Sequence, residues 1–273
     1  MNCTVIGGNG FIGSALVEYL LAKGLNVWVP EKGSPKIYDR PLGTVIYCAG
    51  NGDCENTPFK VIDSNVTLLS SIIEKSSFER LIYISSTRLY INNTSSQEDA
   101  DLSYISSDGR ALFNLTKLTA EELCRKSKRN VLILRPSNVY GKAINSSLFL
   151  PMLIKNAINN KVIDMYVSPL YQKDYLSVYD LCFVIHNFIS SGWSGTEIYN
   201  VASGENVSAD VIAKFIEAKT GCAVRWHSGF TGESFPVINI DKLQSAMEFK
   251  ARSVLNDLDD MIDIFTKELD KSE

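Results

Sequence analysis

Three glycines near the start of the chain have the spacing of a turn that binds phosphate groups. Gly7, Gly10 and Gly13 follow an apolar run at residues 3–6 and lie where an amphipathic segment begins. A side chain at these positions would block the tight turn, the approach of a pyrophosphate or the packing of a helix onto the strand. The N-terminus of that helix would offer free backbone N–H groups to the anion. The pattern predicts a dinucleotide cofactor, bound by the turn residues Gly7, Asn9, Gly10, Phe11, Ile12 and Gly13.

The residue that follows the second predicted strand bears on the choice between two nicotinamide cofactors. Glu31 can accept hydrogen bonds from both hydroxyls of the adenosine ribose, as NAD requires. Lys32 follows directly and could instead bind the 2′-phosphate of NADP. We therefore expect NAD or NADP as the cofactor, and the acidic residue favours NAD.

Five short segments further along the chain carry polar and aromatic residues in a fixed order. They read YCAG at residues 47–50, LIYISSTRLY at 81–90, LRPSNVYG at 134–141, QKDYL at 172–176 and YNVASGE at 199–205. Together with the glycine turn, they resemble the signature segments of the extended short-chain dehydrogenases/reductases, also called the NAD-dependent epimerase/dehydratase family. The resemblance covers nearly the whole chain. It implies a Rossmann-type fold, NAD or NADP as cofactor and a nucleotide-diphosphate sugar as substrate.

The resemblance also implies a reaction and the residues that carry it. In this family hydride passes between the nicotinamide and a sugar carbon, while a proton moves on or off the sugar oxygen. A serine hydroxyl holds that oxygen, a tyrosine phenol transfers the proton, and a lysine lowers the pKa of the phenol and holds the ribose. Ser86 and Lys117 match the serine and the lysine, and Thr87 lies beside Ser86.

Phenylalanine occupies the position of the expected tyrosine. Phe113 stands four residues before Lys117, so both side chains would lie on one face of a helix. Three hypotheses explain it: a substituted tyrosine in an enzyme altered to trap its substrate, a natural enzyme that uses Thr87 or a water held by Ser86, or a relative that only binds. Because every other element of the site is retained, we favour the first hypothesis.

The other predicted contacts come from matching the five segments residue by residue. The predicted catalytic positions are Ser86, Thr87, Phe113 and Lys117. The predicted cofactor contacts outside the turn are Glu31, Lys32, Cys48, Ala49, Gly50, Ile84, Lys117, Pro136 and Val139. The predicted substrate contacts are Ser86, Thr87, Asn138 and Lys173. Lys173 stands where the family usually has arginine, and it is the expected counter-charge for the diphosphate.

The residues that follow Ser86 separate the reactions of the family. Dehydratases carry Asp-Glu after the catalytic hydroxyl residue, as acid and base for the removal of water, whereas this chain has Thr87 and Arg88. Dehydration is therefore not expected. We expect an NAD(P)-dependent reduction of a 4-keto-6-deoxy sugar at C4, with 4-epimerisation of a nucleotide sugar as the alternative. A non-catalytic NAD(P)-binding relative is the second alternative, supported only by Phe113.

Strands that alternate with helices must position these residues. Apolar runs predict strands at residues 3–6, 27–29, 45–48, 81–84 and 131–134, and amphipathic patterns predict helices at 11–23, 64–75, 110–126, 148–159 and 254–269. This order is typical of α/β proteins with a doubly wound parallel sheet. The interval between Glu31 and Val45 is too short for the strand and helix that the family has there. We therefore expect a sheet that lacks one strand.

Two parts of the chain and a second copy are expected to build the enzyme. Residues 1–140 are predicted to form a dinucleotide-binding domain, to which residues at about 174–202 add strands. Residues 141–273 are predicted to form mainly a smaller α/β part that binds the nucleotide sugar. The helices at 64–75 and 110–126 carry more Leu, Ile and Phe than one inward face needs. The family resemblance implies that these helices pair in a homodimer.

Composition argues against several other classes of protein. The 273 residues include 27 Lys+Arg and 31 Asp+Glu, a net charge of −4, which disfavours nucleic acid and anionic membranes as partners. No apolar run is long enough to span a bilayer and no signal-like stretch opens the sequence, so we expect a cytoplasmic protein. The six cysteines are scattered, and His186 and His227 are the only histidines. No metal site is therefore expected.

Overall fold

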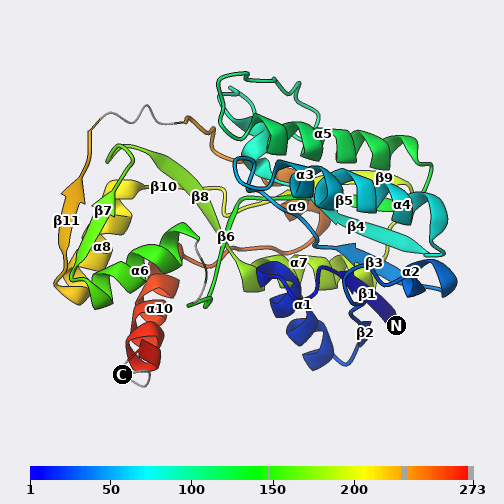
Figure 1. Ribbon diagram of the computed structural model, residues 1–273, viewed down its shortest axis with the longest axis horizontal. Helices are drawn as coiled ribbons and strands as arrows, with labels where there is room; N and C mark the ends of the chain where they lie inside the picture. Colours follow the sequence, from blue (N-terminus) through cyan, green and yellow to red (C-terminus); the bar gives the residue numbers. More distant parts are fainter. Residues whose placement is uncertain (145, 147, 229–232, 270–273) are drawn as a thin grey trace.

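In the computed structural model, which describes residues 1–144, 146, 148–228 and 233–269, parallel strands form a central sheet (Figure 1). Six strands run in the order β2-β1-β3-β4-β5-β9, and each neighbouring pair is parallel. Their bounds are β1 Asn2–Ile6, β2 Asn26–Trp28, β3 Thr44–Tyr47, β4 Arg80–Ile84, β5 Val131–Pro136 and β9 Thr196–Val201.

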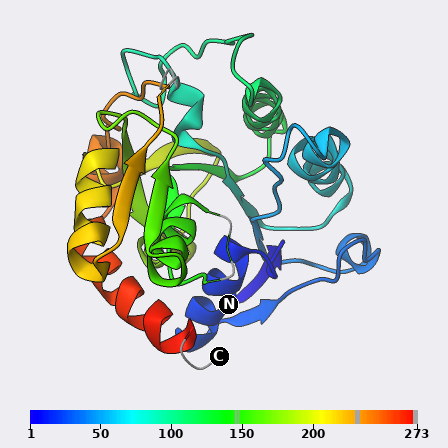
Figure 2. The ribbon, with the colours of Figure 1, turned by 60° about the vertical axis from the view of Figure 1, so that its left-hand side comes forward.

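Helices cover both faces of this sheet (Figures 1 and 2). They are α1 Phe11–Ala22 and α7 Val178–Ser191 on one face, and α4 Leu68–Lys75 and α5 Ala111–Lys126 on the other. Successive residues of a strand point to opposite faces, so Val5 packs under α1 and α7 whereas Ile6 packs under α4 and α5. Burial on both faces explains why these strands are apolar along their length. The doubly wound α/β fold predicted from the sequence is confirmed.

The connection that follows β2 is shortened. Between β2 and β3 the chain forms only the short helix α2 (Lys36–Asp39), and all residues of this interval are described. Within the part of the chain that the structure describes, no strand pairs with the outer side of β2, which is three residues long and partly exposed at the edge of the sheet. The predicted loss of one strand is therefore confirmed.

A second, smaller part of the molecule lies beside the carboxyl ends of β3, β4 and β5 (Figure 1). In it β8 pairs antiparallel with β10 and parallel with β6, and β7 pairs parallel with β11. Three helices, α6, α8 and α10, pack together on these strands. The bounds are β6 Asn138–Tyr140, α6 Phe149–Asn159, β7 Val162–Met165, β8 Gln172–Ser177, β10 Asn206–Ser208, α8 Ala209–Thr220, β11 Ala223–Trp226 and α10 Val254–Leu269. Among the described residues, no helix is long and apolar enough to cross a membrane.

One predicted helix begins differently from the sequence prediction. The segment predicted as a helix at 64–75 starts with a π-helical turn, η1 (Asp63–Thr67), which joins α3 (Pro58–Ile62) to α4. A π turn is wider than an α turn and is often found at functional sites. Here it places Asn65, which is fully buried, between the loop after β3 and helix α5.

Candidate active site

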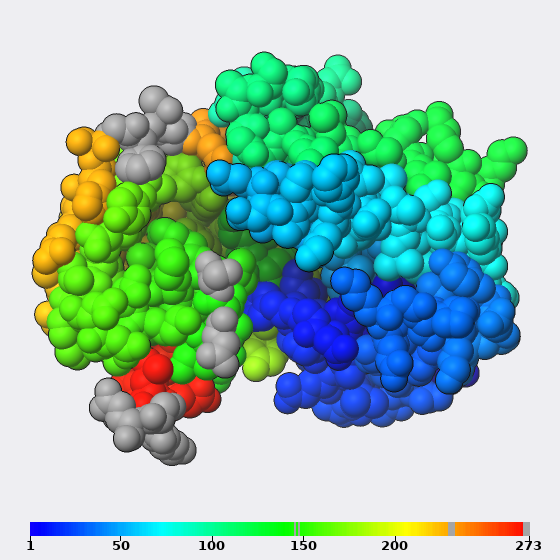
Figure 3. Space-filling model, viewed as in Figure 1, coloured from blue at the N-terminus to red at the C-terminus, as the bar shows by residue number. Residues whose placement is uncertain are grey.

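A cleft of about 560 Å³ separates the two parts of the molecule (Figure 3). On the side of the central sheet, Phe11 and Ile12 of α1, Ile84 of β4 and Pro136 of β5 line it. On the other side it is lined by residues from α6 and β8 and the segments before them, namely Leu148, Phe149, Leu150, Pro151, Val167, Tyr171, Lys173 and Tyr175. Ligands of doubly wound sheets bind in this place, beyond the carboxyl ends of the strands. A smaller hollow of about 80 Å³ adjoins the cleft and shares Ser86, Phe113 and Asn138 with it.

The glycine turn has the geometry that a pyrophosphate needs. Gly7 has φ +80°, and a Cβ there would lie 2.6 Å from the backbone N of Ala49; a Cβ on Gly13 would lie 2.2 Å from the carbonyl oxygen of Gly7. These two glycines are required by the packing of the chain itself. A Cβ on Gly10 would meet only the Gly7 oxygen, at 3.4 Å, so the protein leaves the outer side of the turn open. No side chain caps α1 at Gly10, and the first N–H groups of the helix remain available to an anion.

Lys117 of α5 lines the cleft next to Ile84 of β4. Its side chain is buried, and Nζ donates a hydrogen bond to the carbonyl oxygen of Ile84 at 2.8 Å. Burial lowers the pKa of Lys117 to about 8. Gly50 lies close to this ammonium group, since an added Cβ there would lie 3.7 Å from Nζ, and both residues line the cleft.

Asn65 holds the loop that carries Gly50. Its Oδ1 accepts a hydrogen bond from the backbone N–H of Asn51, and its Nδ2 donates to the Asn51 carbonyl oxygen, both at 3.0 Å. Nδ2 also donates to Thr116 Oγ1 on α5 at 2.9 Å. The π turn is what brings this amide to the loop. The sequence analysis missed Asn65, and the only local signal for it is a polar residue inside an amphipathic helix pattern.

Ser86 and Phe113 face the cleft next to Lys117. Ser86 follows β4, and its Oγ accepts a hydrogen bond from the backbone N–H of Arg88 at 3.1 Å, which caps the short helix η2 (Thr87–Tyr90). The Phe113 ring lies with its centroid 5.6 Å from Lys117 Nζ and 4.6 Å from the Arg110 guanidinium carbon. The arrangement provides a hydroxyl and an ammonium group for a substrate and a cofactor, but position 113 has no proton to transfer.

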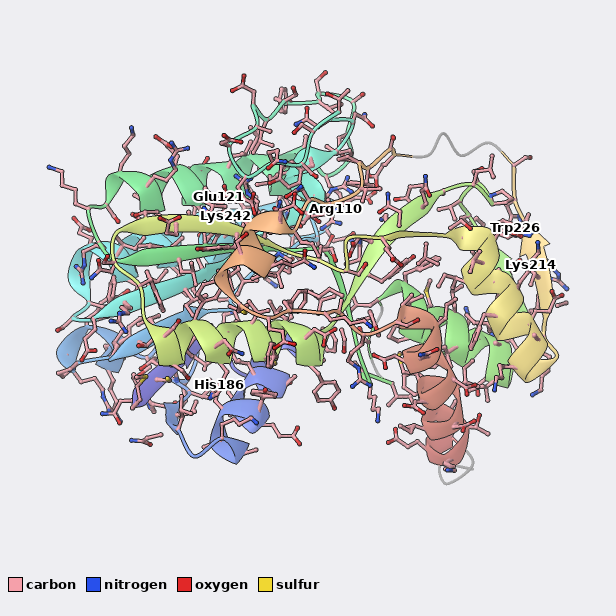
Figure 4. The ribbon with its side chains drawn as sticks, turned by 180° about the vertical axis from the view of Figure 1, so that it is seen from behind. Arg110, Glu121, His186, Lys214, Trp226 and Lys242 are labelled. Carbon is pink, nitrogen blue, oxygen red and sulfur yellow. The ribbon has the colours of Figure 1, made fainter. Side chains whose placement is uncertain are left out.

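A buried polar network supports the strand ends that carry Ser86. Glu121 of α5 accepts a hydrogen bond from Ser85 Oγ at 2.5 Å and bonds with both carboxylate oxygens to Arg135 of β5, at 3.0 and 2.6 Å. Arg135 in turn donates to Tyr90 Oη at 2.6 Å. Figure 4 shows Glu121 along α5 and Arg110 at the start of the same helix, beside the junction of the two parts.

The part of the cleft around Asn138 and Lys173 is polar and cationic. Asn138 donates to the backbone oxygen of Asp174 at 2.8 Å, and Ser137 donates to the Asp174 carboxylate at 2.5 Å. Burial lowers the pKa of Lys173 to about 8, and its Nζ lies 4.0 Å from Glu233. Arg88 and Arg110 line the smaller hollow together with Lys173. Neither arginine was among the contacts predicted from the sequence.

The structure brings together most of the residues singled out from the sequence. The predicted contacts that line the cleft are Phe11, Ile12, Cys48, Gly50, Ile84, Ser86, Phe113, Lys117, Pro136, Asn138, Val139 and Lys173. Thr87 lines only the smaller hollow. The predicted contacts Gly7, Asn9, Gly10, Gly13 and Ala49 belong to the turn and the loop packed against it. Glu31 and Lys32 lie exposed just beyond β2, outside the lining of the cleft.

The two histidines do not form a metal centre. Among the described residues, no group of three His, Cys, Asp or Glu side chains could hold a metal ion. His186 lies on α7 and is partly exposed, edge-on to Tyr19 of α1 with the ring centroids 6.0 Å apart (Figure 4). His186 is not among the residues that line the cleft.

Comparison with known proteins gives one family and a set of similar folds. Residues 3–202 match the model of the "NAD dependent epimerase/dehydratase family". None of the curated proteins matches the chain.

Several solved structures have the same fold. MoeE5 in complex with UDP-glucuronic acid and NAD superposes with a TM-score of 0.85 at 21% identity, over 98% of this chain and 100% of that one. UDP-N-acetylglucosamine 4-epimerase from Methanobrevibacter ruminantium M1, in complex with UDP-N-acetylmuramic acid, gives 0.82 at 17% identity over 98% of each chain. A tyrosine-to-phenylalanine mutant of UDP-glucuronic acid 4-epimerase from Bacillus cereus, in complex with UDP-4-deoxy-4-fluoro-glucuronic acid and NAD, gives 0.81 at 18% identity, over 98% of this chain and 100% of that one.

Proposed function

The chain belongs to the NAD-dependent epimerase/dehydratase family, and from this premise we propose that it exchanges hydride between NAD and C4 of a nucleotide-diphosphate sugar. One observation carries the proposal. Ser86, Lys117 and position 113 converge on a single cleft, next to a glycine turn whose outer side is open. A cleft of about 560 Å³ is within the size range of small-molecule sites.

Each residue has a role that follows from its place. Bound NAD supplies the acceptor or donor of hydride. Lys117 holds the ribose through an ammonium group that Ile84 already orients, and its positive charge favours the ionised form of a phenol at position 113. Ser86 offers a hydroxyl to the reacting sugar oxygen. The N-terminus of α1 holds the pyrophosphate, and Lys173 is placed for the diphosphate of the substrate.

With phenylalanine at position 113, the chain binds the cofactor and the nucleotide sugar but transfers the proton slowly, because no phenol is present. Its ring fills the position of a tyrosine without the hydroxyl, while the groups around it are retained. The tyrosine-to-phenylalanine mutant from Bacillus cereus was solved with a nucleotide-sugar analogue and NAD. That protein supports the idea that a site of this kind binds both molecules without the phenol.

Of the two reactions that the sequence leaves open, we favour 4-epimerisation. The hollow beside Ser86 is bordered by the guanidinium groups of Arg88 and Arg110. A methyl group placed there would remove water from these charges without replacing its hydrogen bonds, whereas a polar C6 group would replace them. The geometry thus suits an ordinary hexose better than a 6-deoxy sugar.

Reduction of a 4-keto-6-deoxy sugar is the second candidate, and the edge of the sheet favours it. A reductase must release its oxidised cofactor in each cycle, whereas an epimerase can retain it. Because no described strand pairs with the outer side of β2, the edge of the sheet nearest Glu31 and Lys32 is uncovered by further strands. An adenosine bound there would be free to leave.

The substitution Phe113→Tyr tests the site and separates the reactions. General acid–base catalysis contributes roughly 10²–10⁴-fold, so the tyrosine variant should exceed the parent chain by about that factor. Its rate is measured by NMR with UDP- and dTDP-hexoses, for the appearance of the 4-epimer, and by NADH consumption with nucleotide 4-keto-6-deoxy sugars. Epimer without net NADH consumption supports the epimerase, and NADH consumption supports the reductase.

Phe113→Leu is the matched control, because it changes the same side chain without adding a hydroxyl. It should be no faster than the parent. If Phe113→Tyr is also no faster on a substrate that it demonstrably binds, the proposed proton-transfer site is wrong and the chain is a non-catalytic NAD-binding relative.

A further inference from the structure

Arg88 is a buried cation two residues after Ser86, whose hydroxyl we propose to hold the reacting sugar oxygen. Its side chain is only 8% exposed, and its backbone N–H donates to Ser86 Oγ. The guanidinium group bonds to two carboxylates: Nη2 donates to Asp108 at 2.7 Å, and Nη1 and Nη2 donate to the two oxygens of Glu233 at 2.9 and 2.5 Å. Its Nε is buried and has no hydrogen-bond partner among the described residues.

The two carboxylates differ in how firmly the fold holds them. The Asp108 side chain is 4% exposed and also accepts hydrogen bonds from Asn114 Nδ2 at 2.7 Å and from the Arg110 backbone N–H at 2.9 Å. Asp108 is thus a fixed counter-ion that already neutralises Arg88. The Glu233 side chain is 34% exposed and comes from the C-terminal part of the chain. Its remaining contacts are Tyr171 Oη at 3.0 Å and Lys173 Nζ at 4.0 Å.

Without Glu233, the hollow beside Ser86 would carry an excess of positive charge. Arg110 and Lys173 line it with Arg88, while Asp174, an acid in its wall, is engaged by Ser137, Ser203 and the backbone N–H of Gly204. Glu233 does not line the hollow itself but contacts two of its cations, Arg88 and Lys173. The two-bond contact of Glu233 shows that Arg88 accepts a carboxylate in the forked geometry that guanidinium groups prefer.

The size of the hollow says which part of a ligand can enter it. At about 80 Å³ it has room for a substituent of the sugar but not for a nucleoside diphosphate, which needs the adjoining cleft. It also contains Ser86 and Phe113, so the group that enters it belongs to the ring whose C4 oxygen meets Ser86. A negatively charged group that enters this hollow therefore belongs to the sugar and not to the diphosphate.

We propose that Arg88 recognises a carboxylate on the sugar, so that the substrate is a nucleotide-diphosphate hexuronic acid, and that Glu233 occupies the place of this carboxylate until the substrate binds. The inference rests on the proposed function, because it names the substrate class of the same site. Arg110 and Lys173 complete the cationic wall. A hexuronic acid is not a 6-deoxy sugar, so the inference also selects the first of the two candidate reactions.

The decisive experiment removes the internal carboxylate. Glu233→Gln keeps the shape of the side chain but withdraws the charge that competes for Arg88. Calorimetric titration of the parent chain and the variant, both with bound NAD, uses UDP-glucuronate, UDP-glucose and UDP, with the dTDP forms in parallel. We expect Glu233→Gln to bind UDP-glucuronate about tenfold more tightly, the size of a charge-assisted hydrogen bond. UDP-glucose and UDP gain only from the loss of the weaker contact between Glu233 and Lys173 at 4.0 Å, so their affinities should change much less. Glu217→Gln, which removes the same charge from the exposed face of α8, should change none of these affinities.

A second variant tests Arg88 directly. Arg88→Met alone would leave Asp108 buried without its counter-ion, so it is combined with Asp108→Asn, and thermal melting confirms that the double variant is folded. It should lose the preference for UDP-glucuronate over UDP-glucose and keep its affinity for UDP. Equal tightening of UDP by Glu233→Gln would mean that Arg88 binds the diphosphate, and equal affinity of the parent for the two sugars would mean that no carboxylate is recognised. Either result overturns the inference and leaves the proposed function intact. Failure of every nucleotide sugar to bind would instead refute the proposed function.

Discussion

Lys173 and Lys117 are the two lysines of the cleft whose pKa burial lowers to about 8, and each should respond to pH near neutrality. A lysine is charged below its pKa and neutral above it. A nucleotide diphosphate is attracted only by the charged form, so binding that depends on Lys173 should be full below pH 8 and should weaken as the pH rises through 8.

We expect the affinity for a nucleotide sugar, titrated without cofactor, to fall about tenfold between pH 7 and pH 9. Lys173→Gln should bind about as weakly at pH 7 as the parent does at pH 9, with little pH dependence. Lys214→Gln, on the exposed face of α8 (Figure 4), is the matched control and should behave as the parent. A Lys173→Gln chain that keeps the full pH dependence would assign the titration to another group.

At this scale the sequence predicted the residues that sit in short motifs and missed those that meet across the fold. Ser86 and Lys117 could be predicted because the family spacing marks them. Arg88 was used only to exclude dehydration, because its partner Glu233 is 145 positions away and nothing in the local sequence of Glu233 indicates a site. Asn65 was missed because its role depends on a π turn that no residue pattern specifies.

Among the elements, the glycine turn allows the cofactor contact to be separated from folding. Ala at position 10 meets only the Gly7 oxygen, at 3.4 Å, and replacing Gly by Ala at a helix N-cap costs about 0.5–1 kcal/mol. We expect Gly10→Ala to fold normally in urea titrations and to bind NADH about tenfold less tightly, a loss of about 1.4 kcal/mol, because its methyl group occupies the open side of the turn.

Gly13→Ala provides the contrast. Its Cβ would lie 2.2 Å from a backbone oxygen, so the turn must shift, and the free energy of unfolding should fall by about 1–3 kcal/mol. If Gly10→Ala binds NADH as tightly as the parent, measured by cofactor fluorescence, the outer side of the turn does not hold the pyrophosphate.

Helix α5 carries two adjacent glutamates with opposite environments. Glu121 is buried in its bonds to Ser85 and Arg135, whereas Glu122 is half-exposed beside Lys126 at 3.3 Å. Removing one partner of a buried ion pair leaves an uncompensated charge, so Glu121→Gln should lower the free energy of unfolding by about 3 kcal/mol. Glu122→Gln should change it by about 0.5 kcal/mol or less. Urea unfolding followed by circular dichroism measures both, and equal effects would show that the buried network contributes little.

Helices and strands were predicted well where the apolar residues follow a single spacing, that of a helix or that of a buried strand, along the whole segment. The predicted helix at residues 254–269 matches α10, and the predicted strands of the central sheet differ from the observed ones by one or two residues at their ends. The short strands β7 and β11 were missed, since each is four residues long and its partner lies far along the chain. The order of apolar and polar residues within a short segment does not indicate which distant segment it pairs with.

At the scale of the whole molecule, dimerisation is expected along the helices at residues 64–75 and 110–126, and α3 packs beside them. Phe59 of α3 and Leu115 of α5 are exposed apolar side chains on helices that pack against each other. We expect a mass of twice the 30.3 kDa of one chain by light scattering at micromolar concentration. Leu115→Glu should shift the mass to that of the monomer, whereas Leu170→Glu, at an exposed leucine of the C-terminal part, should not. A monomeric parent chain would contradict this prediction.

Strand β9 also governs the order in which the protein can be completed during its synthesis. It pairs with β5 from Val131 opposite Thr196 to Pro136 opposite Val201, but α6, β7, β8 and α7 are all translated between the two strands. Until residue 201 has left the ribosome, the outer edge of β5 has no partner and can pair with any other nascent chain. The central sheet, although five of its six strands come first in the sequence, is therefore completed only after part of the smaller second part of the molecule has been made.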